Sequence, residues 1–194
     1  MDGTLDHTMI RVADLERSLD WYRTHLEYEE KDRHEGDGFT IVYLGPEEMH
    51  EDGALLEITH NEGERPEIGD AWGHIAVRVP EGELEAAYEQ LLEEGVEDYR
   101  DPESCGGSYA FVTDPDGHEV EIVQRDHGAR WSLDHTMVRV DDLAEDWATL
   151  MTREAPDYRD PASNDHTYAF TTDQDGHEVE LLERDPGAGS LFPF

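Results

Sequence analysis

Residues 5–12 read LDHTMIRV, and this stretch decides the fold because it returns twice further along the chain. Residues 133–140 read LDHTMVRV, and residues 73–79 read GHIAVRV. Polar and apolar residues alternate in each copy, which is typical of a β-strand with two different faces. A stretch that returns after about sixty residues indicates repeated copies of one small module. The sequence therefore predicts three related modules.

Each module closes with a second strand that carries a glutamate. The three are Glu57 in LLEITHN, Glu121 in HEVEIVQ and Glu180 in HEVELLE, and they follow their module's histidine by 50, 47 and 45 residues. Between the strand with the histidine and the strand with the glutamate, each module has a helical stripe of apolar residues and further strand-like stretches. Each module is therefore expected to have the order βαβββ. The expected module boundaries are 1–64, 65–126 and 127–194, the last including a C-terminal tail.

Four polar side chains are expected on one face of the paired modules. In an α+β fold of this kind, each sheet packs a helix on one face, and two curved sheets enclose a cleft with the other. His7 and Glu57 from module 1 and His74 and Glu121 from module 2 face that cleft. Two imidazoles and two carboxylates suit a divalent transition metal, whereas burying them unpaired would be unfavourable. The alternative is that each histidine closes a strand and each glutamate is solvated, but three pairs in matching places disfavour it.

Composition indicates the surroundings in which the protein works. Among 194 residues, 50 are acidic and 14 basic, so the net charge is −36. Because molar salt shortens the screening length to about 3 Å, this acidic shell is typical of a halophilic protein. The charge disfavours nucleic acid and anionic membranes as partners. The single Cys105 excludes an intrachain disulfide. We expect a soluble, cytoplasmic protein, since no apolar run approaches about 20 residues and no signal-peptide pattern is present.

Several motifs together resemble one known family over residues 5–124. HTMIRV, SLDWY, LLEITHN, GHIAVRV and DPDGHEVEIV are similar to glyoxalase I, lactoylglutathione lyase, of the vicinal oxygen chelate superfamily. The resemblance implies the glyoxalase/bleomycin-resistance/dioxygenase fold and one divalent metal for each pair of modules 1 and 2. It favours Ni or Co, with Zn or Mn as alternatives. It implies metal ligands at His7, Glu57, His74 and Glu121.

The same resemblance implies substrate-binding residues and a reaction. Arg11 and Asn61 would hold the γ-glutamyl end of a thiol, glutathione or an analogue, and Arg100 would meet its other carboxylate. The substrate would be the hemithioacetal of this thiol with methylglyoxal, isomerised through an enediolate to a 2-hydroxyacyl thioester, which is a detoxification of methylglyoxal. Glu121 is the first candidate for the base that moves the proton, and Glu57 is the second.

Other functions occur on the same fold, so the fold alone does not decide. An extradiol-type dioxygenase would use two histidines and one glutamate on Fe(II), which four filled ligand positions disfavour. A methylmalonyl-CoA epimerase would need a cavity for CoA, which this acidic chain is poorly suited to supply. A drug-binding protein of the bleomycin-resistance type would lack the ligands, so metal content separates it from the enzymes.

Module 3 keeps the liganding pattern at His135 and Glu180, and it has Arg139 and Arg159 where modules 1 and 2 have Arg11 and Arg100. If modules 1 and 2 satisfy each other, module 3 needs a partner. We therefore expect a homodimer through module 3, with His135 and Glu180 in a second metal site. The alternative is a decayed duplicate that only covers surface. The remaining histidines are expected on the surface: His25, His34, His50, His60, His118, His127, His166 and His177.

Overall fold

The computed structural model describes residues 6–48, 54–69, 72–152, 159–164, 168–172 and 178–183. They divide into two compact units. The N-terminal unit consists of residues 5–68 and 75–134, and the C-terminal unit contains residues 69–74 together with the chain from 135 onward. In the part of the chain described, no helix is long and apolar enough to cross a membrane.

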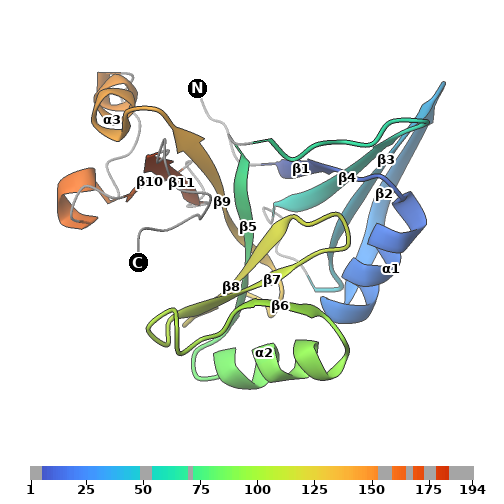
Figure 1. Ribbon diagram of the computed structural model, residues 1–194, viewed down its shortest axis with the longest axis horizontal. Coiled ribbons are helices and arrows are strands. Elements are labelled where there is room, and N and C mark those ends of the chain that lie inside the picture. Colours follow the sequence, from blue (N-terminus) through green and yellow to red (C-terminus); the bar gives the residue numbers. More distant parts are fainter. Residues whose placement is uncertain are drawn as a thin grey trace. The chain divides into compact units, whose positions relative to one another are not determined.

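Module 1 forms a four-stranded sheet with one helix on it (Figure 1). Its elements are β1 (His7–Arg11), α1 (Leu15–His25), β2 (Tyr28–Gly36), β3 (Phe39–Pro46) and β4 (Leu55–Asn61). The strand order is β1-β4-β3-β2, with β1 parallel to β4. Helix α1 begins after Asp14, whose carboxylate accepts the N–H of Arg17 at 3.1 Å. Its Leu19 and Tyr22 are fully buried, as is Ile58 on β4, so the helix-facing side of the sheet is the core.

Module 2 repeats this plan within the same unit. Its elements are β5 (Trp72–Pro80), α2 (Leu84–Glu93), β6 (Glu97–Arg100), β7 (Tyr109–Thr113) and β8 (Glu119–Arg125), in the strand order β5-β8-β7-β6. Ala87 and Leu91 of α2 are fully buried, and so are Val77 on β5 and Ile122 on β8. The intervening polar positions of these strands therefore face away from α2.

Module 3 supplies the C-terminal unit. It contains β9 (Leu133–Val140), α3 (Leu143–Thr152), the 3₁₀ turn η1 (Pro161–Asn164), β10 (Tyr168–Thr172) and β11 (Glu178–Glu183), in the order β10-β11-β9. Leu143 and Trp147 of α3 pack with Ala169 and Leu181 of the sheet. Modules 1 and 2 each have a fourth strand next to their third one. In module 3 a single antiparallel β-bridge between Arg159 and Phe170 takes the place of that strand. The expected α+β class with repeated βαβββ-type modules is confirmed; the expected module boundaries stay predictions.

Strands β5 and β9 pass through both units and pair in each. In the N-terminal unit, the N–H of Arg78 donates to the carbonyl of Ser132 at 3.0 Å. In the C-terminal unit, the Thr136 hydroxyl donates to the carbonyl of His74 at 3.4 Å. In the C-terminal unit, β5 and β9 bring the side chains of His74 and His135 into contact.

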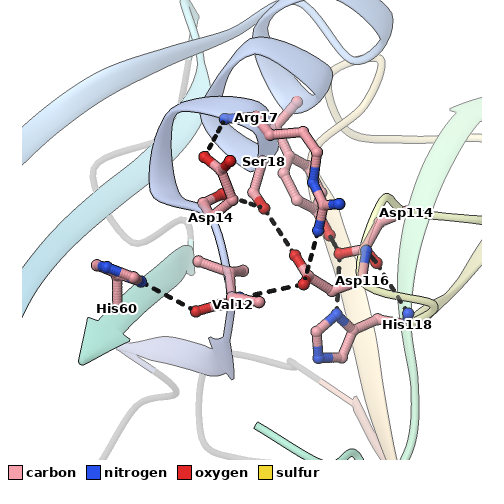
Figure 2. A network of polar contacts seen from close by, with 10 residues as sticks. Val12, Asp14, Arg17, Ser18, His60, Asp114, Asp116 and His118 are labelled. Atoms are coloured by element: carbon pink, nitrogen blue, oxygen red, sulfur yellow. Dashed lines mark hydrogen bonds and ion pairs between the residues drawn. The ribbon is translucent and has the colours of Figure 1, made fainter. Parts of the chain in front are cut away.

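A turn of module 2 anchors the first helix of module 1. Figure 2 shows Asp116 in the β7–β8 turn beside the start of α1. Its carboxylate accepts the Ala13 N–H at 3.1 Å, the Arg17 guanidinium at 2.8 Å and the Ser18 hydroxyl at 2.9 Å. A carboxylate at a helix N-terminus satisfies free N–H groups and complements the helix dipole. Hydrogen bonds to Asp116 therefore connect modules 1 and 2 within this unit.

His118 lies in the same turn, and the expectation that it is a surface residue is wrong. It is buried because the turn folds back on Asp114, whose carboxylate meets its Nδ1 at 2.9 Å and its backbone N–H at 2.8 Å (Figure 2). The Tyr22 hydroxyl donates to Asp114 at 3.1 Å, and burial together with Asp114 raises the pKa of Tyr22. His34 and His127 are exposed as expected. His25 and His60 are half-buried, and the other three surface-assigned histidines lie outside the described residues: His50, His166 and His177.

Candidate metal centre

Three ligand-type side chains converge in the C-terminal unit. His74 is on β5, His135 on β9 and Glu180 on β11. Strands β9 and β11 are parallel, with His135 opposite Glu178 and Met137 opposite Glu180. Alternation along these strands places His135 and Glu180 on one face and leaves Val138 and Leu181 to pack on α3. The repeated strand pattern therefore directs the polar side chains away from the core.

The three side chains are in contact and almost completely buried. His74 Nε2 lies 3.1 Å from His135 Nε2 and 3.3 Å from Glu180 Oε2, and His135 Nε2 lies 3.6 Å from the same oxygen. Their exposed fractions are 1%, 2% and 7%. The rings of Phe170 and His135 form a T-shaped pair, with ring centres 5.3 Å apart. We call His74, His135 and Glu180 the enclosed set.

Electrostatics keep the carboxylate of the enclosed set ionised. Burial alone raises the pKa of Glu180. Hydrogen bonds from His135 and His74, and the positive charge that these rings can carry, outweigh burial, so the pKa of Glu180 lies below its ordinary value. An ionised carboxylate beside two imidazole nitrogens is in the protonation state that a divalent cation needs.

The spacing of the enclosed set fits a common metal ion. Two ligand atoms bound at about 2.0–2.1 Å to one ion lie roughly 3.0–3.4 Å apart. The three separations in the enclosed set, from 3.1 to 3.6 Å, are close to that range. Imidazole and carboxylate are donors that Ni, Co, Zn and Mn accept. This buried His/Glu cluster could therefore bind a divalent metal.

A second, smaller pair lies in the N-terminal unit. His7 Nε2 on β1 meets Glu57 Oε2 on β4 at 3.0 Å. Asp6 holds His7 Nδ1 at 2.7 Å, and the Thr59 hydroxyl donates to Glu57 Oε1 at 2.8 Å. The hydrogen bond with Glu57 is the main reason that the pKa of Tyr43 is raised. We call His7 and Glu57 the open pair, because the His7 side chain is 35% exposed.

Within each unit the structure brings several of the predicted ligands into contact. It brings His7 to Glu57, and it brings His74 to His135 and Glu180. Glu121, on β8, is buried. His135 and Glu180, for which we expected mates from a second chain, lie against His74 of their own chain.

The predicted substrate-binding residues lie on β-strands with different surroundings. Arg11 is exposed at the end of β1, and the Asn61 side chain donates to Glu64 at 2.7 Å. Arg100 is at the end of β6, with its guanidinium 5.5 Å from the centre of the Tyr99 ring. Their roles stay predictions.

Sequence reasoning missed the groups that support the open pair and the enclosed set. Thr59 follows Glu57 by two residues on the same strand, and that spacing could have identified it as a neighbour on the same face. The Phe170 ring lies next to both Arg159 and His135. The Arg159 guanidinium is 5.2 Å from the centre of the Phe170 ring, and the same ring packs against the His135 ring. No local pattern marks Phe170, because its two partners, Arg159 and His135, come from other parts of the chain.

Comparison with known proteins identifies the family. Residues 4–122 match the family described as the Glyoxalase/Bleomycin resistance protein/Dioxygenase superfamily. A lactoylglutathione lyase of Neisseria meningitidis is 40% identical over 129 residues, covering 63% of this chain and 91% of the relative. A lactoylglutathione lyase of Escherichia coli O157:H7 is 33% identical over 132 residues, covering 64% and 94%.

Solved structures agree on the fold. Glyoxalase I from Zea mays superimposes with a TM-score of 0.76 at 23% identity, over 94% of this chain and 68% of that one. The glyoxalase I of Leishmania major gives a TM-score of 0.55 at 27% identity, over 79% and 99%. The chain therefore belongs to the Glyoxalase/Bleomycin resistance protein/Dioxygenase superfamily. Within it, the chain is an enzyme of the lactoylglutathione lyase, or glyoxalase I, type.

Proposed function

We propose that the protein is a metal-dependent glyoxalase I whose chemistry takes place at the enclosed set. It would isomerise the hemithioacetal formed by methylglyoxal and a γ-glutamyl thiol, glutathione or an analogue, to a 2-hydroxyacyl thioester. The observation that carries the proposal is the convergence of two imidazoles and a carboxylate, all buried and within 3.6 Å of one another. Uncompensated burial of such groups is unfavourable, and a divalent cation compensates it.

His74, His135 and Glu180 would hold the metal. We propose Glu121 as the fourth ligand, because it stands in module 2 where Glu180 stands in module 3 and is equally buried. Ni or Co is favoured, and Zn or Mn are alternatives. When bound, the metal supplies a positive charge next to the vicinal oxygens of the substrate, which stabilises negative charge as the proton leaves carbon.

A carboxylate of the chain moves the proton. The hydrogen on C1 of the hemithioacetal leaves as a proton, a carboxylate accepts it, and the same carboxylate returns it to C2. Electrons move from the C1–H bond into the carbon framework, so C1 is oxidised, C2 is reduced, and no external redox partner is needed. We propose Glu121 as this base, with Glu180 positioned as a ligand by its contacts with both histidines.

Positive side chains of the chain suit the anionic thiol. The Arg159 guanidinium lies over the ring of Phe170, and that ring forms a T-shaped pair with His135, so a positive charge is present near the enclosed set. It stands in module 3 where Arg100 stands in module 2, which is the position predicted to meet a carboxylate of the thiol. We propose that Arg159 serves this purpose for the enclosed set, since a guanidinium binds a carboxylate through paired hydrogen bonds.

The proposal is tested by turnover of the methylglyoxal hemithioacetal, prepared with one thiol at a time, on metal-reconstituted protein in molar salt. Glu121→Gln should lower turnover by about 100-fold or more while the fold is kept, because a positioned base contributes that much. Glu89→Gln, an exposed change on α2, is the matched control and should retain turnover. Wild-type turnover by Glu121→Gln would remove Glu121 from the base role. Absence of turnover with every thiol would contradict the function.

A further inference from the structure

We propose that Tyr22, Asp114 and His118 are positioning residues for Glu121, the carboxylate that moves the proton in the proposed function. Through these residues, helix α1 of module 1 would hold the strand of module 2 on which Glu121 stands. The assignment rests on the role proposed for Glu121, and all four residues belong to the N-terminal unit.

The carboxylate of Asp114 is the centre of this buried cluster. One of its oxygens accepts the backbone N–H groups of Asp116 and His118, at 2.9 and 2.8 Å. The other oxygen accepts the Tyr22 hydroxyl at 3.1 Å and lies 2.9 Å from Nδ1 of His118, which Figure 2 shows beside it. Tyr22, Asp114 and His118 are at most 5% exposed, so water is not at hand to replace a lost hydrogen bond. Four donors around two oxygens fix the orientation of the carboxylate.

Tyr22 connects the turn to another element of the fold. Its ring lies in the core of module 1, stacked on Tyr28 with ring centres 6.1 Å apart, and α1 is itself held at its start by Asp116. Burial, and then the charge of Asp114, raise the pKa of Tyr22, so the hydroxyl keeps its proton and donates. The β7–β8 turn of module 2 is therefore tied to a packed helix of module 1.

His118 connects Asp114 to strand β8. Its carbonyl accepts the backbone N–H of Asp114 at 3.0 Å, which closes the hairpin between β7 and β8. Strand β8 begins at the next residue, and Glu121 stands three residues after His118, opposite Phe111 on β7. A shift of the turn is therefore passed along a short, extended piece of backbone to Glu121.

Packing and the turn act on Glu121 in different ways. Val120 and Ile122 are fully buried, and their burial decides which face of the sheet Glu121 occupies. Apolar burial is not directional, whereas hydrogen bonds have preferred distances and angles. A catalytic group has to be held to about 0.5 Å, and a misplacement of about 1 Å can lower a rate roughly 100-fold. The hydrogen bonds of Asp114 supply that finer placement.

Tyr88 on α2 provides a matched comparison. It is 4% exposed, and its hydroxyl donates to Asp98 on β6. Both tyrosines are thus buried helix residues that donate to an aspartate. The partner of Tyr22 lies in the turn that leads into the strand of Glu121, whereas the partner of Tyr88 lies on the edge strand of the same sheet. A merely structural role predicts that losing either hydroxyl has the same consequences.

The first test removes one hydroxyl at each place, in Tyr22→Phe and Tyr88→Phe, and measures turnover of the methylglyoxal hemithioacetal by Ni²⁺-loaded protein in molar KCl. Both variants should remain folded by circular dichroism and bind as much Ni²⁺ as the wild type. Tyr22→Phe should lower kcat by about 10-fold and change KM by less than about twofold, because the base is displaced while substrate binding is kept. Tyr88→Phe should retain kcat.

The second test exchanges the side chain of His118. The amide of an asparagine can donate to Asp114 from nearly the position of Nδ1, whereas leucine has no donor. His118→Asn should therefore retain most of the wild-type kcat, and His118→Leu should lose about 10-fold or more. This pair decides the question if Tyr22→Phe does not fold.

Amide hydrogen exchange of metal-free protein tests the placement of β8 without activity. In Tyr22→Phe, the N–H groups of residues 119–121 should exchange about 10-fold faster relative to those of α1, and Tyr88→Phe should not show this change. If the wild type turned over the hemithioacetal of no thiol, the exchange difference would still establish the hold of α1 on β8, and only the proposed function would fail.

Three results would overturn the inference. The first is the same kcat in Tyr22→Phe and Tyr88→Phe. The second is a His118→Leu variant as active as His118→Asn. The third is exchange at residues 119–121 that does not respond to Tyr22→Phe.

Discussion

The enclosed set and the open pair begin from the same sequence motif and differ in what meets them. In the C-terminal unit, His135 and Glu180 are joined by His74 from β5, and all three are at most 7% exposed. In the N-terminal unit, His7 and Glu57 have support from Asp6 and Thr59, but the His7 side chain stays 35% exposed. A repeat therefore places the same residue types at equivalent positions, whereas strand pairing determines which of these side chains come into contact.

The open pair and the enclosed set also differ in how much hydration their side chains keep. A half-exposed histidine such as His7 keeps much of its hydration and gains little from pairing with a carboxylate, even one as buried as Glu57. Completely buried ones lose that hydration, and a cation that replaces it is held tightly. The enclosed set should therefore hold metal more strongly than the open pair and account for most of the activity.

The largest expected effect comes from breaking the enclosed set. His135→Gln removes one nitrogen ligand and should lower hemithioacetal turnover by about 10³-fold, since metal stabilisation of the developing charge is worth several kcal/mol. Steady-state kinetics on Ni²⁺-loaded protein, with elemental analysis of the same samples, measure it. His34→Gln is the control. Full turnover by His135→Gln would show that the chemistry lies elsewhere.

A smaller effect is expected from the glycine that precedes His74. A Cβ on Gly73 would lie 2.7 Å from the carbonyl oxygen of Met137 and would also collide with the Met137 side chain, so β5 and β9 would have to separate. Gly73→Ala should destabilise the C-terminal unit by about 1–3 kcal/mol, as overpacking does, and weaken Ni²⁺ binding by the enclosed set.

The matched control for Gly73→Ala is Gly36→Ala on β2. There the three atoms nearest to the added Cβ belong to the ring of Phe39, a half-buried side chain that can rotate away. Thermal unfolding and Ni²⁺ titration of both variants make the comparison. Equal losses of stability in the two variants would contradict the assignment of a backbone clash to Gly73.

The smallest effect is expected far from both ligand groups, at the turn that anchors α1. Asp116→Asn keeps the shape of the side chain but removes the charge that Arg17 and the helix N-terminus meet, which should reduce stability by about 1–2 kcal/mol. Denaturant unfolding measures the loss. Ni²⁺ per chain should not change, and a loss of metal in this variant would mean that the turn also shapes a ligand set.

Much of the fold could be predicted from the sequence because the signals repeat. The alternation in residues 5–12 and its two copies predicted the strands β1, β5 and β9, and each predicted helix packs on its own sheet. The glutamates that close the modules are buried at the expected positions, with Glu57, Glu121 and Glu180 each below 9% exposure. Periodicity of this kind depends only on neighbouring residues, so the sequence alone reveals it.

The meeting of His74 with His135 could not be predicted in the same way. It depends on β5 pairing with β9, which arises from hydrogen bonds between strands about sixty residues apart. The family resemblance favoured module 1 as the mate of module 2, and modules 1 and 3 begin with nearly identical stretches, so no local pattern indicates module 3 instead. The burial of His118 was missed for a related reason. Its turn was recognisable, but Tyr22 and Ser18, which hold that turn, come from a distant helix.

The most direct test of the central claim is the anomalous scattering of crystals grown from Ni²⁺-loaded protein, recorded at the Ni absorption edge. We expect a strong peak about 2.0–2.2 Å from the ring nitrogens of His74 and His135 and from a carboxylate oxygen of Glu180. A loaded, active crystal with its anomalous peak away from these three side chains would contradict it.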